Sequence, residues 1–365
     1  MTLPDELRPI TDLEQLDLTG HHLSSLPESL VRFTRLRRLL IDDNWLPSLP
    51  EWLGELKDLE QLFADDNRLT SLPAALEQLQ RLERLDVRGN LLDTIPERLG
   101  DLTGLRDLRL GKNRLTWVPE SLWRLTRLET LDLSENQLSS LSSGLGELSK
   151  LRMLDLGHNA LTELPESIGR LTGLSGYLYL SNNRLTSLPA SLGNLSALRY
   201  LNATDNQLTS LPETLGGLGA LRELRLYNNQ LTALPGTLGD LASLRELYLK
   251  DNALVSLPES MGKLTSLRRL SLEGNALTSL PASLGGLPRL AELDLRNNRL
   301  SALPGSLGDL QSLAYLDLRG NRLRSLPESL GDLARLEKLD LRWNKLSSLP
   351  EWLERLERRG CAVLT

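Results

Sequence analysis

Residues 290–312 read LAELDLRNNRLSALPGSLGDLQS, and Leu313 begins the same pattern again. Apolar and polar residues alternate over residues 293–295, which predicts a short strand with one buried face. The second half, LPGSLGDLQSL, spaces its leucines by four, three and three residues, which predicts one helical or 3₁₀ turn. Each 23-residue stretch is therefore expected to hold one strand and one helical turn.

This stretch recurs along the whole chain with an asparagine at its ninth position. The asparagines are Asn44, Asn67, Asn90, Asn113, Asn136, Asn159, Asn183, Asn206, Asn229, Asn252, Asn275, Asn298, Asn321 and Asn344. Every step is 23 residues except the step from Asn159 to Asn183, which is 24. His21 takes this position in the first unit, which gives fifteen units. One unit cannot bury its leucine face alone, so neighbouring units must stack.

The pattern LxxLxLxxNxL resembles the leucine-rich-repeat family, and the resemblance covers essentially the entire chain. The 23-residue form with LPxxLGxL is most similar to intracellular members, including plant Ras-group-related, Scribble-like and bacterial cytosolic proteins. The resemblance implies an α/β leucine-rich-repeat solenoid, a curved horseshoe or superhelix with a parallel β-sheet on its concave face and short helical or 3₁₀ segments on its convex face. Three departures are His21 for Asn, Ser142 for the repeat proline and an extra residue near Gly176.

Proline and glycine give further expectations for the helical half of the unit. Proline at its start suits the first helical position, where no amide bond is lost. Glutamate follows the proline in units such as Pro258-Glu259 and favours the positive end of the helix. Glycines such as Gly262 weaken a helix, so we expect short, irregular segments.

The repeats predict a single domain over residues 1–365. We expect an N-terminal half-repeat cap over residues 1–12, about fifteen repeats over residues 13–350, and a C-terminal cap of one helix and one strand over residues 351–365. Gly360 is expected to end that helix. Because both ends have this form, the sequence favours a complete array. A monomer is expected.

Composition narrows the class of partner and the compartment. The net charge of −6 argues against a nucleic-acid binder, which needs a basic face. No apolar run is long enough to span a membrane, and the N-terminus has no signal-peptide pattern. Cys361 is the only cysteine, so no intrachain disulfide can form. A reducing, cytoplasmic location is therefore expected.

Catalytic groups are sparse. His21 and His22 lie about six units from His158, roughly 30 Å at one strand spacing per unit. Cys361 is expected to be a small residue at the edge of the core, and the glycines recur with the repeat instead of forming a phosphate-binding loop. We expect no catalytic residues, no cofactor, no metal site and no small-molecule substrate.

The positions that flank the buried strand leucine are expected to face the concave side, and they divide into three zones. In the first, Asp42 and Asp65 lie beside Leu40 and Phe63, which marks either an interface or coils covered by the N-terminal cap. In the second, tyrosines gather, and tyrosine is a frequent interface anchor. Its residues are Tyr177, Tyr179, Tyr200, Tyr227 and Tyr248, with Arg109 and Arg225 at equivalent positions.

The third zone pairs arginines with aspartates. Arg296, Arg319 and Arg342 each follow an aspartate by two residues, so this ladder is expected to neutralise itself. Arg299, Arg322, Lys345 and Trp343 belong to the same zone. A charge gradient remains, because residues 1–182 carry 20 basic and 29 acidic groups, whereas residues 183–365 carry 22 and 19. Such a gradient would orient a partner of opposite polarity.

These features favour a non-catalytic scaffold that binds a folded protein partner on the concave face, in intracellular signalling. A bacterial effector that binds a host target is the alternative. An enzyme hidden in the repeats is a third hypothesis, and turnover abolished by Cys361→Ala or His158→Ala would support it.

Overall fold

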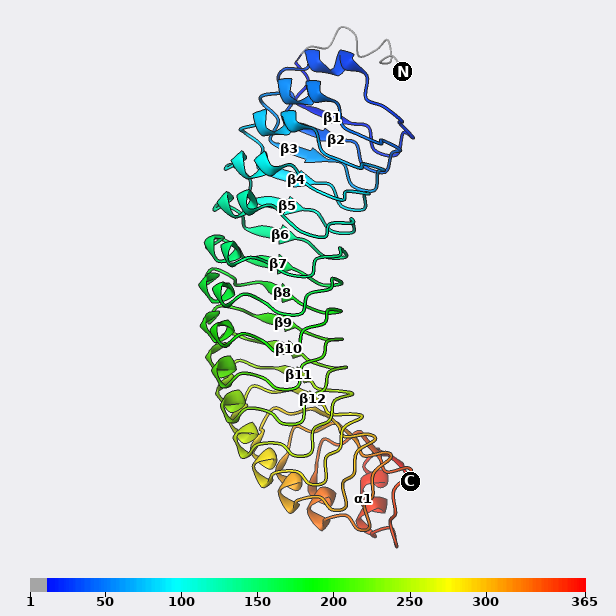
Figure 1. The fold of residues 1–365 in the computed structure, drawn as a ribbon. Helices are drawn as coiled ribbons and strands as arrows, with labels where there is room; N and C mark the ends of the chain where they lie inside the picture. Colours follow the sequence, from blue (N-terminus) through cyan, green and yellow to red (C-terminus); the bar gives the residue numbers. More distant parts are fainter. Residues whose placement is uncertain (1–11) are drawn as a thin grey trace. The chain divides into compact units, whose positions relative to one another are not determined.

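The computed structural model describes residues 12–365, so all of the expected cap over residues 1–12 except Asp12 lies outside the described residues. The chain divides into two compact units, residues 1–179 and residues 180–365. In each unit the coils contribute one short strand each and, apart from the coil that holds α1 in the second unit, one short 3₁₀ segment. The strands form a parallel sheet in sequence order (Figure 1). The 3₁₀ segments line the side of the coils opposite the sheet.

The first unit contains strands β1–β8 and 3₁₀ segments η2–η8. Its strands are β1 Gln15–Asp17, β2 Arg38–Leu40, β3 Gln61–Phe63, β4 Arg84–Asp86, β5 Asp107–Arg109, β6 Thr130–Asp132, β7 Met153–Asp155 and β8 Tyr177–Tyr179. Its 3₁₀ segments are η2 Glu28–Arg32, η3 Glu51–Glu55, η4 Ala74–Gln78, η5 Glu97–Asp101, η6 Glu120–Arg124, η7 Ser143–Glu147 and η8 Glu166–Arg170.

The second unit contains strands β9–β16, 3₁₀ segments η9–η15 and one α-helix. Its strands are β9 Tyr200–Asn202, β10 Glu223–Arg225, β11 Glu246–Tyr248, β12 Arg269–Ser271, β13 Glu292–Asp294, β14 Tyr315–Asp317, β15 Lys338–Asp340 and β16 Ala362–Leu364. Its helical segments are η9 Ala190–Asn194, η10 Glu213–Gly217, η11 Gly236–Asp240, η12 Glu259–Lys263, η13 Ala282–Gly286, η14 Gly305–Asp309, η15 Glu328–Asp332 and α1 Trp352–Arg358.

A column of leucines fills the interior of each unit. One coil buries Leu290, Leu293, Leu295, Leu300, Leu303, Leu307 and Leu310, each at most 9% exposed. Because successive strands pair in register, as Leu293 does with Leu316, each leucine lies over its equivalent in the next coil. Burying a leucine side chain stabilises by about 1.5–3 kcal/mol, so stacking supplies the stability that one coil lacks.

The repeated asparagine ties neighbouring coils together through the backbone. The Oδ1 atom of Asn298 accepts a hydrogen bond from the Leu277 amide of the preceding coil at 3.0 Å. Its Nδ2 atom donates to the Leu272 carbonyl of that coil at 2.9 Å and to the Leu295 carbonyl of its own coil at 3.1 Å. The side chain is 5% exposed, so an apolar residue here would leave buried backbone groups unpaired.

The 3₁₀ segments are short, as expected, but proline and glycine act differently from the sequence prediction. Pro304 has an extended backbone (φ −68°, ψ 143°) and precedes the first residue of η14 instead of occupying it. Gly239 is required by close packing, because a Cβ there would lie 2.2 Å from the Ser260 carbonyl oxygen of the next segment. Glycine therefore lets successive 3₁₀ segments approach each other closely.

One pair of coils replaces this glycine with a tryptophan and adapts around it. Trp123 is 4% exposed in η6, and a Cβ on Gly144 in η7 would lie 2.2 Å from its Cδ1 atom. Gly144 thus provides the space for the indole ring where neighbouring segments carry serine or threonine. Ser142, which replaces the repeat proline, accepts a hydrogen bond from the Gly144 amide through Oγ at 3.2 Å. The substitution of this proline is therefore compensated by a side-chain cap.

The 24-residue unit absorbs its extra residue at the entry to β8. Leu154 pairs with Leu178 and Asp155 with Tyr179, an offset of 24, so only two residue pairs form here instead of three. The Gly176 amide donates to the Arg152 carbonyl at 2.9 Å, and a Cβ on Gly176 would lie 2.9 Å from that oxygen. The extra residue is therefore accommodated just before the strand, where glycine allows the two backbones to approach closely.

Candidate functional site

The exposed surface of each sheet, here called the strand face, carries three side chains from every coil. In the coil of β13 these are Glu292, Asp294 and Arg296, and each is partly exposed while Leu293 and Leu295 point into the core. The sequence prediction treats the second and third of these positions coil by coil and includes the first only at Tyr177 and Tyr200. The first lies on the same face because strand side chains alternate, and that period-two rule could have identified it.

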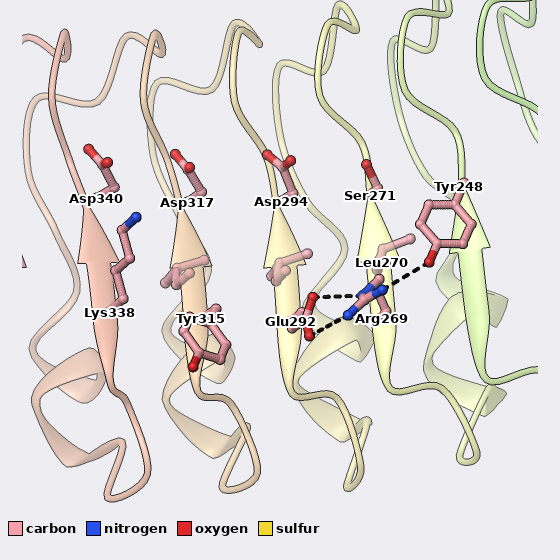
Figure 2. Close-up of a pocket in the computed structure, with 12 residues that line it drawn as sticks. Tyr248, Arg269, Leu270, Ser271, Glu292, Asp294, Tyr315, Asp317, Lys338 and Asp340 are labelled. Carbon is pink, nitrogen blue, oxygen red and sulfur yellow. Dashed lines mark hydrogen bonds and ion pairs between the residues drawn. The ribbon is translucent and has the colours of Figure 1, made fainter. Parts of the chain in front are cut away.

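A hollow of about 410 Å³ opens on the strand face of β11–β15 (Figure 2). Its lining residues are Tyr248, Arg269, Leu270, Ser271, Glu292, Leu293, Asp294, Tyr315, Leu316, Asp317, Lys338 and Asp340. Ser271 is the small residue between Tyr248 and Asp294 at the equivalent position of three adjacent strands. This gap in side-chain size is the signal in the sequence that could have indicated the hollow.

One side of the hollow is held by an arginine network. The Arg269 guanidinium donates to both carboxylate oxygens of Glu292 at 2.6 Å and to the Tyr248 hydroxyl at 3.1 Å. The Tyr248 hydroxyl in turn donates to Glu246. Burial raises the pKa of Tyr248, as does its hydrogen bond to Glu246, so the hydroxyl stays protonated near neutral pH. These contacts fix the side chains before a ligand arrives.

The opposite side of the hollow is the aspartate–arginine ladder. Arg296 lies 2.6 Å from Asp294 and 3.6 Å from Asp317. Arg319 lies 2.6 Å from Asp317 and 3.3 Å from Asp340. The ladder therefore pairs within itself, as the sequence predicted, and contributes little net charge to the hollow.

Asp340 lies at the end of this ladder and is fully buried rather than facing solvent. Burial alone would raise its pKa, but hydrogen bonds from the Arg342 side chain and backbone and the charge of Arg319 together lower it. Arg342 is 2.6 Å from its carboxylate. Asp86 is likewise 1% exposed, with Arg88 at 2.8 Å. These two aspartates are thus structural anchors for arginines and not contact residues.

Two exposed groups at the hollow remain available to a ligand. Tyr315 is 46% exposed, and its hydroxyl donates to Glu337 at 2.7 Å, which leaves the ring faces open. Lys338 is exposed, and no carboxylate among residues 12–365 lies within ion-pair distance of its ammonium group. An exposed ring beside an unpaired cation is the arrangement that an interface uses.

The tyrosines of the predicted zone belong to both units. In the second unit the Arg225 guanidinium lies over the rings of Tyr200 and Tyr248, at 5.5 and 5.3 Å, and Arg225 also pairs with Glu223 at 2.6 Å. Tyr227 is half-buried on the same strand face. Of these tyrosines only Tyr248 lines the hollow.

In the first unit Tyr177 and Tyr179 stack with ring centroids 5.9 Å apart. They line a smaller hollow of about 120 Å³ together with Arg109 and Met153. Tyr177 and Met153 are 43% and 39% exposed, so this hollow has an apolar rim. Burial raises the pKa of Asp155, in its lining, to about 6.

The predicted acidic and apolar zone carries more arginine contacts than the sequence suggested. Phe63 is covered by Arg38 and Arg84, whose guanidinium carbons lie 5.1 and 4.6 Å from its ring centre. Leu40 is only partly exposed.

Asp42 and Asp65 occupy adjacent coils of this zone, and the Asp65 amide donates to Asp42 at 3.0 Å. Burial and the neighbouring Asp65 raise the pKa of Asp42 to about 8. This position therefore holds a proton near neutral pH.

The histidines and the cysteine have structural contacts. His22 stacks on Trp45 at 4.8 Å, and the His21 ring nitrogen contacts the Thr19 carbonyl at 2.8 Å. Cys361 is a buried free thiol whose pKa is raised by burial, so it stays protonated. Within residues 12–365 no group of three or more His, Cys, Asp or Glu side chains could hold a metal ion. No helix in that range is long and apolar enough to cross a membrane.

Comparisons with known proteins agree with this architecture. The model described as leucine-rich repeat region matches residues 139–247 and 182–299, and the model described as leucine rich repeat matches residues 57–115, 80–138, 103–161 and 288–346. The chain belongs to the leucine-rich-repeat family. No curated protein matches it significantly.

Solved structures show the same fold. A leucine-rich-repeat protein of Leptospira interrogans is 33% identical with a TM-score of 0.82, over 100% of this chain and 98% of that one. A plant peptide hormone receptor solved in complex with RGF2 is 29% identical with a TM-score of 0.74, over 94% of this chain and 61% of the receptor. The Toll–Spatzle complex of Drosophila is 25% identical with a TM-score of 0.80, over 92% of this chain and 48% of that one.

Proposed function

We propose that this chain is a binding protein that holds a segment of a partner protein across the strand face of β11–β15. The observation that carries the proposal is the 410 Å³ hollow at Ser271, with the exposed ring of Tyr315 and the unpaired ammonium of Lys338 at its edge. The leucine-rich-repeat fold is commonly a protein–protein interaction module and typically a non-catalytic scaffold.

The chemistry of the hollow defines what a bound segment should present. An apolar side chain would fill the space above Ser271 and stack on Tyr315, because tyrosine offers a large contact area at little entropic cost. A carboxylate would pair with Lys338, the one lining cation that the described residues leave unpaired. The hollow is open across several strands, which suits an extended polypeptide better than an enclosed small molecule.

The comparisons support a polypeptide as the ligand. The plant receptor of similar fold is named as a peptide hormone receptor and was solved with RGF2, and Toll was solved with Spatzle. We extend the proposal to intracellular signalling in the cytoplasm, because the single cysteine is a buried thiol and forms no disulfide. Cell fractionation of the native protein tests the location independently of binding.

The test is selection of binders from a random peptide library, followed by titration of the selected peptides. We expect Tyr315→Ala with Lys338→Glu to weaken binding at least about tenfold, the loss of one good anchor. The control is Trp117→Ala with Arg335→Glu, which alters an aromatic and a cation of comparable exposure away from the hollow. Equal affinity for the site variant and the wild type would refute the site.

A further inference from the structure

The edge of the coils next to the strand face accumulates positive charge in the last three repeats. It consists of the turns at residues 297–302, 320–325 and 343–348, which read NNRLSA, GNRLRS and WNKLSS and are called the turn edge below. These turns carry Arg299, Arg322, Arg324 and Lys345 and no acidic residue. All four side chains belong to exposed residues, and no ion pair within residues 12–365 involves any of them.

This edge differs from the strand face beside it. On the strand face the arginines that follow β13, β14 and β15 each lie 2.6 Å from an aspartate, so their charge is already paired. The equivalent turns at residues 205–210 and 251–256 carry an aspartate and no cation. Single turns elsewhere also carry cations, as Arg68, Arg114 and Arg184 show, but only in the last three coils do three consecutive turns each carry one. The turn edge is therefore a run of cations over adjacent coils.

Trp343 provides a second, independent observation at this edge. Its backbone has φ 61°, a left-handed conformation that costs a bulky residue free energy and that glycine, asparagine or aspartate adopts in most equivalent positions. Its side chain is 72% exposed, so the ring gains no core packing in return. A strained, exposed aromatic residue is an indication of binding, because neither folding nor packing favours it.

Trp343 and the cations line one open hollow. The hollow has a volume of about 540 Å³ and is lined by Arg299, Arg322, Trp343 and Lys345 together with asparagines of the repeat. The Arg342 guanidinium lies 5.7 Å from the Trp343 ring centre, which adds a further cation near the ring. The surface therefore offers three cations, one per coil at about 4.8 Å spacing, with an aromatic face at their end.

We infer that the turn edge of the last three coils binds a short acidic segment of a partner protein, with carboxylates on Arg299, Arg322 and Lys345 and an apolar side chain on Trp343. Carboxylates complement arginine and lysine through charge-assisted hydrogen bonds. The strip spans only three coils, and the equivalent positions of the two preceding coils are Ala253 and Ala276, so a long polyanion such as nucleic acid would gain no further pairing there. A short acidic peptide fits the available length.

Fluorescence anisotropy with the full chain tests this inference. The probe is a fluorescein-labelled peptide of ten aspartates and glutamates interrupted by one central phenylalanine. We expect the triple variant R299E/R322E/K345E to weaken binding at least about tenfold and Trp343→Gly to weaken it several-fold. The urea midpoint of the Trp343→Gly variant should equal or exceed that of the wild type, because glycine suits the left-handed conformation. Weaker binding by this variant therefore cannot come from unfolding.

The matched control is R114E/R127E/R184E, which reverses three exposed arginines with no ion pair among the described residues and changes the net charge equally. It should bind the peptide within about twofold of the wild type at about 0.15 M salt, where distant charges are screened. Equal weakening by the control would overturn the inference. Absence of peptide binding by the wild type would also overturn it. The inference fails as well if the wild type binds a single-stranded DNA oligonucleotide or phosphatidylserine vesicles more tightly than the peptide and the triple variant abolishes that binding. Lys338→Glu should leave this binding unchanged, which separates it from the proposed strand-face site.

Discussion

Replacing Asn298 with alanine tests how much one repeat asparagine contributes to stability. The substitution removes the acceptor of the Leu277 amide, a 3.0 Å hydrogen bond that has no replacement within the described structure. The three carbonyls that the side chain contacts keep other donors. Leu272 retains the Asn275 side chain at 3.0 Å, Leu295 retains the Asn321 side chain at 2.8 Å, and Arg296 retains the Gly274 amide at 2.9 Å.

The magnitude follows from this difference. An orphaned buried amide costs about 1–3 kcal/mol, and each of the three lost bonds to carbonyls that keep another donor costs about 0.5 kcal/mol. The sum is about 2.5–4.5 kcal/mol for Asn298→Ala. The neighbouring Arg299→Ala is the control, because an exposed side chain without an ion pair should change stability by less than about 0.5 kcal/mol.

Urea denaturation followed by circular dichroism measures the free energy of unfolding, and hydrogen exchange locates the loss. Because long repeat arrays need not unfold in one step, the exchange data must show the Leu277 amide losing protection while amides several coils away keep theirs. A loss below about 1 kcal/mol, or unchanged protection of the Leu277 amide, would refute the assignment of this hydrogen bond as a stabilising contact.

Two further outcomes follow from the packing and the titrating groups. Gly144→Ala should lower the free energy of unfolding by about 1–3 kcal/mol, because the new Cβ would lie 2.2 Å from Trp123. This loss should largely disappear when Trp123 is also replaced by glycine. A coupling energy below about 0.5 kcal/mol in the double-mutant cycle would contradict the contact. Folding raises the pKa of Asp42 from its ordinary value of 3.8 to about 8, so the folded state binds the proton more tightly than the unfolded state. The free energy of unfolding should therefore fall as the pH rises from about 4 to about 8. Urea midpoints measured from pH 4 to pH 9 should therefore fall in the wild type and fall less in Asp42→Asn, and parallel curves would exclude this role.

The sequence predicts the coil and its stacking well, because the leucine and asparagine positions act locally and repeat. It also predicts the self-paired ladder, since Asp294 and Arg296 lie on one strand face at a spacing of two. The depth of burial is harder to predict. Asp340 is fully buried and Ser271 leaves a hollow, and both depend on the size of side chains in adjacent coils.

The glycines of the 3₁₀ segments show why the packing between coils cannot be predicted from one repeat. From one unit alone, Gly262 is a helix-weakening residue. In the structure its Cβ would lie 2.6 Å from the Ser283 carbonyl oxygen, so the constraint comes from the next coil and is invisible within a single repeat. The contact of Trp123 with Gly144 cannot be predicted from one repeat either, because Gly144 lies 21 residues further along the chain, in the next coil.

The Trp123 and Gly144 contact limits how this array can change its length. Most coils here would fit beside any other, because leucine, asparagine and glycine recur at the same positions. The two coils around Trp123 are an exception. Separating them would place the indole ring against a serine or threonine Cβ, or leave Gly144 beside an unfilled space. In an engineered array these two coils should therefore be duplicated or deleted together, as one block of 46 residues, twice the repeat length.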